Sequence, residues 1–317
     1  MVRFDYLVKG LSGLAKAHRA GPMAGHLGAA VVAGYFLGED VTNLPAGVYR
    51  AIEAELDRIM RGEETVWFDP KKMGVTVPQL FEPMVAEPPQ AALIPQIAEA
   101  LSRNIGQLRQ SGHNVIFAAA ALRSLHDHPQ FAPPSCVAGI CKLIEAFNNA
   151  SPGRGYYGRQ RGWQGGEEVI LSQRPPIAPY RSLSAMTEIV VNELIHGASI
   201  RRRGFGGLFH IINHAAGLIE LSAFGYKKLA ETGLAAHHRH VCLWRTLPDV
   251  SNELGPLQKA EHDPRTVDYW SRKKSVQWSA WLTHRIKTLY GFFTLMRFVE
   301  DVATRKQAER ALLYLMA

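Results

Sequence analysis

The feature that most constrains this chain is the spacing of its apolar residues, which recur at intervals of three and four along most of the sequence. Such spacing places them on one face of a helix, whereas a half-buried strand requires strict alternation. The segment 46–60 is typical, because its valine, isoleucine and leucine residues share one stripe. On this basis helices are predicted over 23–37, 46–60, 88–108, 113–125, 134–147, 182–198, 207–224, 226–244 and 276–299, with a last helix beginning near residue 304.

Strand signals are confined to two short apolar runs at 66–68 and 169–171, each flanked by polar or glycine-rich sequence. They predict lone extended segments or a small hairpin. The fold class is therefore all-α, as a single large helical domain of repeated helix hairpins around a central cavity. A length of 317 residues suits one large domain over 1–317, and the alternative is a division into 1–150 and 180–317.

Two long irregular segments interrupt the helical pattern. The first spans 62–87, and the second spans 148–181 and is dense in glycine, proline, arginine and aromatic residues. Structureless segments of this length inside a compact domain are usually functional lids or linkers. Because Tyr156, Tyr157 and Trp163 suit packing onto an apolar ligand, we expect the second segment to be a loop that covers a substrate.

Histidine opens several of the most apolar helices. The segments HLGAAVVAGYFL from His26, HNVIFAAAALRSL from His113 and HIINHAAGLIEL from His210 share small residues about a turn and a half after the histidine, and HRIKTLYGFFTL from His284 is a weaker fourth copy. Small residues allow helices to approach closely, so these segments are predicted to be inner helices whose histidines point into one cavity. A first-turn position disfavours imidazolium and keeps the ring able to accept a proton or bind a metal.

A metal site nearer in sequence is the main alternative. His196 and Glu193 lie near the end of one predicted helix, and His210 and His214 lie at i and i+4 on the next. A short turn between antiparallel helices would let these four side chains hold iron or zinc. Buried histidines also serve purely structural roles, satisfying backbone groups in a helical-repeat scaffold.

Composition excludes several classes of protein. The three cysteines form no paired framework and suit a reducing cytoplasm. No stretch is apolar enough to predict a membrane span. The net charge of +8 is scattered and no nucleic-acid motif accompanies it, so no nucleic-acid partner is expected. The absence of a GxGxxG fingerprint means that a nicotinamide or flavin would bind without the usual dinucleotide domain.

Together, the segments GHLGAAVVAGYFLGED, SGHNVIFAAAALRSL, FHIINHAAGLIEL and HRIK resemble the questin oxidase-like family. That family pattern has a histidine-led helix ending in Leu-Gly, a Gly-His-led helix, a later histidine-containing helix and a C-terminal His-x-x-Lys. In this chain the matching positions are His26 with Leu37-Gly38, Gly112-His113, His210 with His214, and His284 with Lys287. The resemblance implies an all-α oxidoreductase that oxygenates rings of aromatic polyketides in a Baeyer–Villiger manner, with NADPH as the implied cofactor.

Three functional hypotheses follow. The first is an oxygenase-type oxidoreductase for an aromatic or apolar small molecule, with His26, His113, His210 and His284 as acid/base or ligand groups and Lys287 stabilising a phenolate or enolate. The second is a metalloenzyme centred on His196, His210 and His214. The third is a helical-repeat scaffold that docks an acidic partner.

Overall fold

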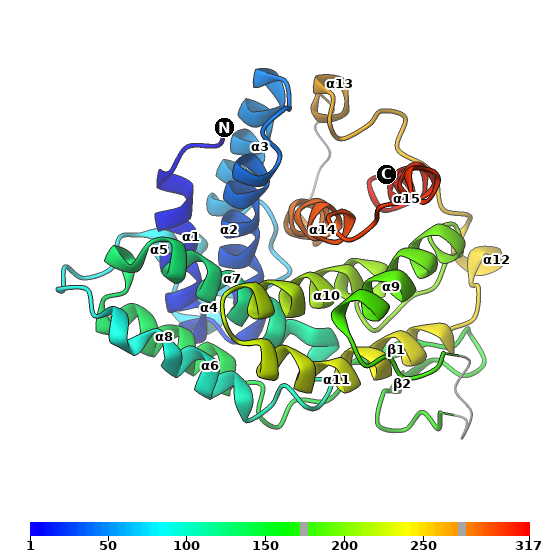
Figure 1. Cartoon of the computed structure of the whole chain (residues 1–317), viewed down its shortest axis with the longest axis horizontal. Helices are drawn as coiled ribbons and strands as arrows, with labels where there is room; N and C mark the ends of the chain where they lie inside the picture. Colours follow the sequence, from blue (N-terminus) through cyan, green and yellow to red (C-terminus); the bar gives the residue numbers. More distant parts are fainter. Residues whose placement is uncertain (172–176, 272–276) are drawn as a thin grey trace.

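The computed structural model describes residues 1–171, 177–271 and 277–317, and in these ranges the chain forms one all-α domain with a single small sheet (Figure 1). The helices are α1 Asp5–Lys16, α2 Gly25–Asp40, α3 Ala46–Met60, α4 Pro70–Met73, α5 Val77–Phe81, α6 Pro95–Ser102, α7 His113–Asp127, α8 Pro134–Glu145, α9 Leu183–Gly197, α10 Gly207–Ala223, α11 Lys227–Arg245, α12 Ser251–Leu254, α13 Val267–Trp270, α14 Trp281–Met296 and α15 Val302–Leu315. The strands β1 Arg154–Tyr156 and β2 Trp163–Gly165 pair antiparallel.

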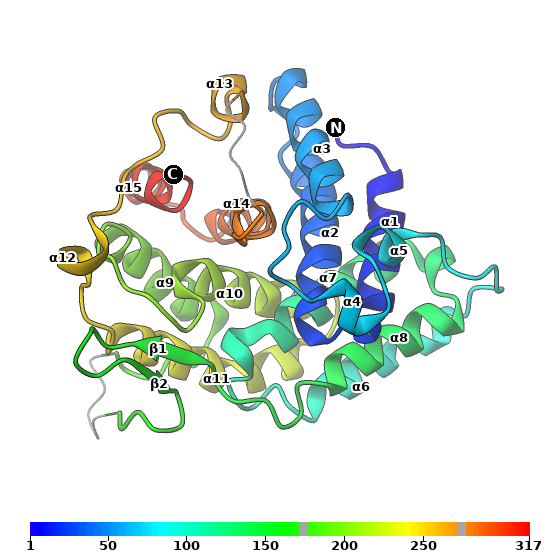
Figure 2. The same cartoon turned by 180° about the vertical axis from the view of Figure 1, so that it is seen from behind.

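Four buried helices form the centre of the domain. α10 packs against α7, α11 and α14, and α14 also packs against α2. Figures 1 and 2 show α10 running through the middle of the molecule, with α14 and the lower end of α2 beside it. α2, α7, α10 and α14 are apolar on nearly every face because each is surrounded by other helices. Helices from both halves of the chain therefore build one interior.

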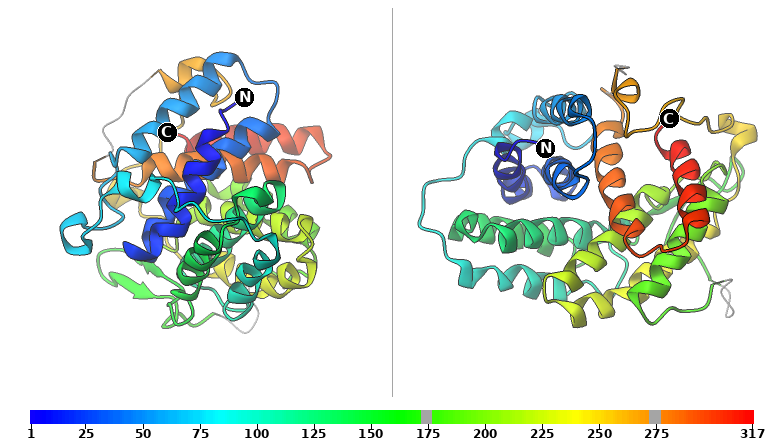
Figure 3. Two further views of the ribbon diagram at one scale, coloured as in Figure 1. Left: turned by 90° about the vertical axis from the view of Figure 1, so that its left-hand side faces the viewer. Right: turned by 45° about the horizontal axis from the view of Figure 1, so that its top comes forward.

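Small residues set the closest approach in this interior. α1 crosses α2 at Gly28, where an added Cβ would lie 2.4 Å from the backbone nitrogen of Leu14. α7 meets α10 near Gly217, whose added Cβ would lie 3.1 Å from Val115. The glycine and alanine spacing in the sequence thus brings the backbones of the inner helices together. α15 follows α14 and packs on α9 at one side of the domain (Figure 3).

Most of the predicted helices are present, and the differences have local causes. The helix expected over 88–108 is limited to α6, because Pro95 occupies its first position and a 3₁₀ turn over Ala91–Leu93 precedes it. The predicted helix 276–299 begins at Trp281, and residue 276 lies outside the described residues. The amphipathic helix α1, at the N-terminal end, was not predicted from the sequence.

The irregular segments contain more structure than expected. Residues 62–87 include the short helices α4 and α5, which begin with proline after Asp69 and Thr76 as their N-terminal caps. The hairpin is formed by β1 and β2, and neither of the apolar runs at 66–68 and 169–171 belongs to it. Residues 172–176 of the second segment lie outside the described residues. Among the helices described, none has the length and apolar character that a membrane crossing requires.

Candidate functional site

Each of the four inner helices places one histidine in a common cluster. The central histidine group consists of His26 on α2, His113 at the start of α7, His210 on α10 and His284 on α14. The Nε2 atoms of His26 and His113 lie 2.5 Å apart, and those of His210 and His284 lie 2.7 Å apart. The two pairs adjoin, since the ring centroids of His113 and His210 are 4.5 Å apart. With Lys287, which contacts His26, the structure brings together all five residues predicted as catalytic.

Backbone carbonyls fix the protonation of two of these rings. His284 Nδ1 lies 2.8 Å from the carbonyl oxygen of Ala280, and His113 Nδ1 contacts the carbonyl oxygen of Gln110. A carbonyl oxygen only accepts, so in both rings Nδ1 carries the proton and donates it. Each neutral ring therefore directs the lone pair of Nε2 into the group. This is the tautomer that metal-binding histidines adopt when their outer nitrogen is hydrogen-bonded.

The carbonyl that holds His113 belongs to a strained turn. Gln110, Ser111 and Gly112 have φ values of 41°, 57° and 85°, all in the left-handed region. The turn is held by its amides, because Gln110 N donates to Ser151 O at 2.7 Å and Ser111 N to Pro152 O at 2.9 Å. Strain of this kind persists only where the surroundings impose it, and it is concentrated at functional sites. Here it aims the Gln110 carbonyl back at the ring three residues later.

His26 is held on two sides. Its Nδ1 contacts the Nζ of Lys287, and its ring stacks on Trp67 with a centroid distance of 3.9 Å and an interplanar angle of 19°. Trp67 also lies 5.7 Å from the ring of His284, so one indole covers two histidines. Trp67 is half-buried and forms the wall of the central histidine group that residues 62–68 supply.

Glu64 links that wall to α14. Its buried carboxylate accepts hydrogen bonds from the indole Nε1 of Trp67 at 3.1 Å and from the amides of Leu282 and Thr283, the second at 3.3 Å. These amides belong to the first turn of α14, where the helix dipole favours a negative charge. Glu64 therefore caps the helix that carries His284 and Lys287. Burial nevertheless raises the pKa of Glu64, while the same hydrogen bonds oppose that rise.

Burial decides the charge of the group. It lowers the pKa of His284 to about 3, and it holds the pKa values of His26, His113 and His210 well below the ordinary value. Burial also lowers the pKa of Lys287 to about 7, with the Glu64 carboxylate acting in the opposite direction. At neutral pH the histidines are neutral, so their nitrogens are free to act as ligands or proton acceptors.

The arrangement of nitrogens fits a metal ion. His26, His210 and His284 each offer one ring nitrogen, and these three atoms lie within 4.8 Å of one another. Metal–imidazole bonds of about 2.0–2.1 Å place neighbouring ligand nitrogens roughly 3 Å apart and opposite ones about 4 Å apart. The pairs at 2.5 and 2.7 Å therefore need to open by about half an ångström around an ion. His113 Nε2, beside His26, is the fourth available ligand.

A groove reaches the group from one side. It has a volume of about 350 Å³ and is lined by Gly206, Phe209, Ser279, Ala280, Trp281 and His284. The ring of Phe209 lies edge-on to His284 with centroids 5.8 Å apart. The groove is mostly apolar, and aromatic side chains stand on both α10 and α14. It therefore suits a flat apolar molecule placed against His284.

The metal set expected from neighbouring residues is not assembled. His196 is exposed at the end of α9, and the buried carboxylate of Glu193 pairs with Arg245. His210 and His214 both point inward but separate, because His210 joins the central histidine group while His214 Nδ1 lies 3.4 Å from His240 Nδ1. α9 and α10 pack against each other, and the turn between them passes through Phe205 and Gly206 in left-handed conformations.

His214, His237 and His240 form a second histidine group, on α10 and α11. His237 Nε2 donates to Ile211 O at 3.0 Å and His240 Nε2 to Phe205 O at 2.7 Å. The outward ring nitrogens are thus used by backbone carbonyls, and His237 Nδ1 accepts from the hydroxyl of Tyr180. In the part of the chain that the structure describes, no metal-binding arrangement includes these three rings. The group holds the turn before α10 in place.

The aromatic residues expected to cover the substrate lie elsewhere. Tyr156 OH donates to Glu253 at 2.9 Å, and Tyr157 OH is 2.6 Å from the hydroxyl of Thr246. Trp163 is 42% exposed and stacks with Arg203. Figure 2 shows β1 and β2 beside α11 and α12 at the edge of the domain, away from the inner helices. Gly155 pairs with Gly204, which fastens the hairpin to the turn before α10.

Two residues of the site were not predicted. Trp67 and Glu64 fall in the irregular segment 62–87, where the run at 66–68 was interpreted as extended backbone. The signal that points to them is a Glu-x-x-Trp pair inside a loop rich in glycine and proline, since a tryptophan there requires a partner for its indole N–H. No family model, curated protein or solved structure matches this chain. Its function must therefore be argued from these residues and their geometry.

Proposed function

We propose that this chain is a metal-dependent oxidoreductase of the oxygenase type, acting on an aromatic or apolar small molecule. The observation that carries the proposal is the convergence of four neutral imidazoles from four different helices, with Nε2 directed inward. His26, His113, His210 and His284 would hold the ion. Imidazole suits iron, copper, nickel and zinc, and a bound redox metal supplies electron transfer toward dioxygen.

The protein orients the ligands and provides a mostly apolar groove beside them. Gln110 O and Ala280 O fix the rings of His113 and His284, while Lys287 fixes His26. Such contacts to the outer nitrogen set ligand orientation and affinity. The groove beside His284 would place a flat substrate between Phe209 and Trp281, within reach of the same centre. Ring oxygenation of an aromatic polyketide, which the resemblance to the questin oxidase-like family implies, is compatible with a groove of this size and lining.

A metal-free acid–base enzyme is the second candidate, and one observation favours it. When Lys287 Nζ donates to His26 Nδ1, the proton of His26 lies on Nε2 and points at His113 Nε2, whereas with a metal on Nε2 the Nδ1 atom would carry the proton and donate it to neutral Lys287. His113 then donates from Nδ1 to Gln110 O. The donors and acceptors are consistent along this whole line, as a proton relay requires.

Metal analysis of protein purified without an affinity tag separates the two candidates. We expect close to one equivalent of a transition metal per chain, dominated by iron, and its loss in His113→Ala and His210→Ala. His196→Ala is the matched control, because His196 is exposed and outside the central histidine group. Circular dichroism of each variant shows whether a loss of metal reflects a loss of fold. Wild-type protein that stays metal-free after anaerobic incubation with Fe(II) would overturn the metal proposal and leave the relay.

A further inference from the structure

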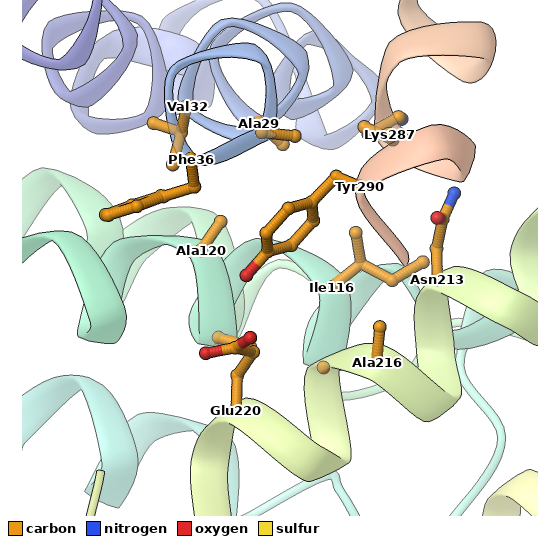
Figure 4. A pocket seen from close by; sticks show the side chains of 13 residues that line it. Ala29, Val32, Phe36, Ile116, Ala120, Asn213, Ala216, Glu220, Lys287 and Tyr290 are labelled. Atoms are coloured by element: carbon orange, nitrogen blue, oxygen red, sulfur yellow. The ribbon is translucent and has the colours of Figure 1, made fainter. Parts of the chain in front are cut away.

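A small cavity lies on the other side of Lys287 from the central histidine group. It has a volume of about 30 Å³ and is lined by side chains from α2, α7, α10 and α14. Six of its thirteen lining residues end at Cβ or have none, namely Ala29, Ala33, Ala119, Ala120, Ala216 and Gly217. Figure 4 shows Ala29, Ala120 and Ala216 around this space, with Ile116 at its side.

The polar groups of the cavity stand at its two ends. Lys287 and Asn213 occupy the end near the histidines, and Asn213 lies three residues after His210 on α10. At the other end the hydroxyl of Tyr290 points toward Glu220 (Figure 4), and both side chains are engaged by Arg123, at 2.7 and 3.3 Å. The cavity shares no lining residue with the groove at Phe209 and Trp281, so the two spaces are separate.

The volume of the cavity limits the size of the molecule that it can bind. A cavity needs roughly 10–15 Å³ on this measure to hold one water-sized molecule, so about 30 Å³ admits a diatomic molecule and excludes an aromatic substrate. Cavities with apolar walls can bind apolar gases such as xenon. The alanine wall therefore favours a small apolar molecule over an ion or an organic acid.

We propose that this cavity is a dioxygen-binding site that serves the central histidine group, so that dioxygen and the organic substrate reach the group from different sides. The inference rests on the proposed function, because it names the second substrate of the same centre. Lys287 separates the cavity from His26, and its contact with His26 places the gas within one side chain of a ligand. Only binding and delivery are assigned to the cavity walls.

Asn213 makes water the molecule that would compete with dioxygen for this cavity. Its side-chain Nδ2 and Oδ1 atoms are buried and have no partner among the described residues. Both atoms could hold a water molecule, which needs two to four polar partners. Water in the cavity would exclude gas, so the experiment must detect gas binding directly rather than infer it from turnover.

The test uses metal-free protein with labelled alanine methyl groups under xenon and under dioxygen pressure. We expect the methyl signals of Ala29 and Ala216 to shift with xenon and to relax faster with dioxygen than other buried alanine methyls. Ala120→Leu fills the cavity from a half-buried position and should abolish both effects. Ala303→Leu, on the exposed face of α15, is the matched control and should leave them unchanged.

A second measurement ties the cavity to the centre. In Fe(II)-loaded protein, Ala120→Leu should slow the oxidation of the iron by dioxygen several-fold, while iron content stays unchanged. The proposal is overturned if Ala29 and Ala216 do not respond to either gas, or if Ala120→Leu excludes xenon yet oxidises at the wild-type rate. Because the gas measurements need no metal, protein that binds xenon here but retains no iron would refute the proposed function alone.

Discussion

His26 and His113 stand 87 residues apart in the chain, yet their Nε2 atoms lie 2.5 Å apart in the interior. Each ring is held from its far side, His26 by Lys287 and His113 by the carbonyl of Gln110. The contact is therefore imposed by two supports that belong to different elements. The residues that support the two rings can therefore be tested by substitution, as the histidines can.

The left-handed turn before His113 gives the first prediction. An added Cβ at Gly112 would lie 2.5 Å from the ring of His214, and its φ of 85° disfavours any other residue. We expect Gly112→Ala to lower the free energy of unfolding by about 2–4 kcal/mol, from backbone strain and the clash together. Gly74→Ala is the control, because Gly74 has a φ of 66° but open space around it. Equal losses in urea unfolding of the two variants would contradict the clash.

Glu64 gives the second prediction. Glu64→Ala removes the acceptor for two amides of α14 and for the indole of Trp67, and should cost about 2–4 kcal/mol of unfolding free energy. Glu64→Gln retains one carbonyl acceptor and should cost less. The neighbouring Glu63→Ala should cost below about 1 kcal/mol, since Glu63 forms partly exposed ion pairs with Arg58 and Arg61. A change in Trp67 fluorescence confined to the Glu64 variants would confirm the contact.

Much of this fold was open to sequence reasoning because packing enforces helical periodicity. The stripe containing Val48 and Ile52 had to form α3, and Pro95 marked the true start of α6. The five central residues were also predictable, since each occupies the first turns of an apolar helix or lies one turn beyond. The sequence could not show whether side chains on the two sides of a turn point toward each other.

The alternative metal set illustrates that limit. Glu193 and His196 are close to His210 in sequence, but the backbone between them passes through Phe205 with a φ of 47°. A left-handed residue that is not glycine carries no sequence signal, because tertiary contacts impose it. Here His240 accounts for it, by donating to the carbonyl oxygen of Phe205. Local proximity therefore predicted the wrong neighbours for His210.

The second histidine group gives the third prediction, on pH dependence. Burial lowers the pKa of His240 to about 4 and that of His237 to about 3, whereas unfolded histidine titrates near 6.5. Below pH 6.5 the unfolded chain binds protons that the folded chain does not, so stability falls as the pH decreases from 6.5 toward 4. His240 alone accounts for at most about 3 kcal/mol of this loss.

His240→Gln tests this assignment, because glutamine can still donate to Phe205 O and accept from His214. The variant should lose about 2 kcal/mol less than wild type between pH 7 and pH 5 in urea unfolding. His196→Gln, at an exposed position, should follow the wild-type curve. If His240→Gln shows the full wild-type loss, the acid sensitivity arises elsewhere in the chain.

The fourth prediction concerns the buried ion cluster that bounds the alanine-lined cavity. Arg123 pairs with Asp40 at 2.7 Å and with Glu220 at 3.3 Å, and its side chain is only 9% exposed. Arg123→Met leaves the Glu220 carboxylate buried without its cation, and should cost about 3–5 kcal/mol. Arg297→Met also removes a partner of Asp40, but Arg297 is 48% exposed, so the cost should stay below about 1 kcal/mol.

A double variant identifies the source of that cost. If the loss in Arg123→Met comes from an uncompensated charge, adding Glu220→Gln should recover a substantial part of it, because the remaining amide is neutral. If the loss comes instead from the packing of the guanidinium over Phe36, where the distance to the ring centroid is 3.8 Å, the second substitution should recover nothing. Thermal and urea unfolding of the two single variants and the double variant distinguish these outcomes. Recovery would show that charge balance, rather than side-chain packing, stabilises the end of the cavity opposite Lys287.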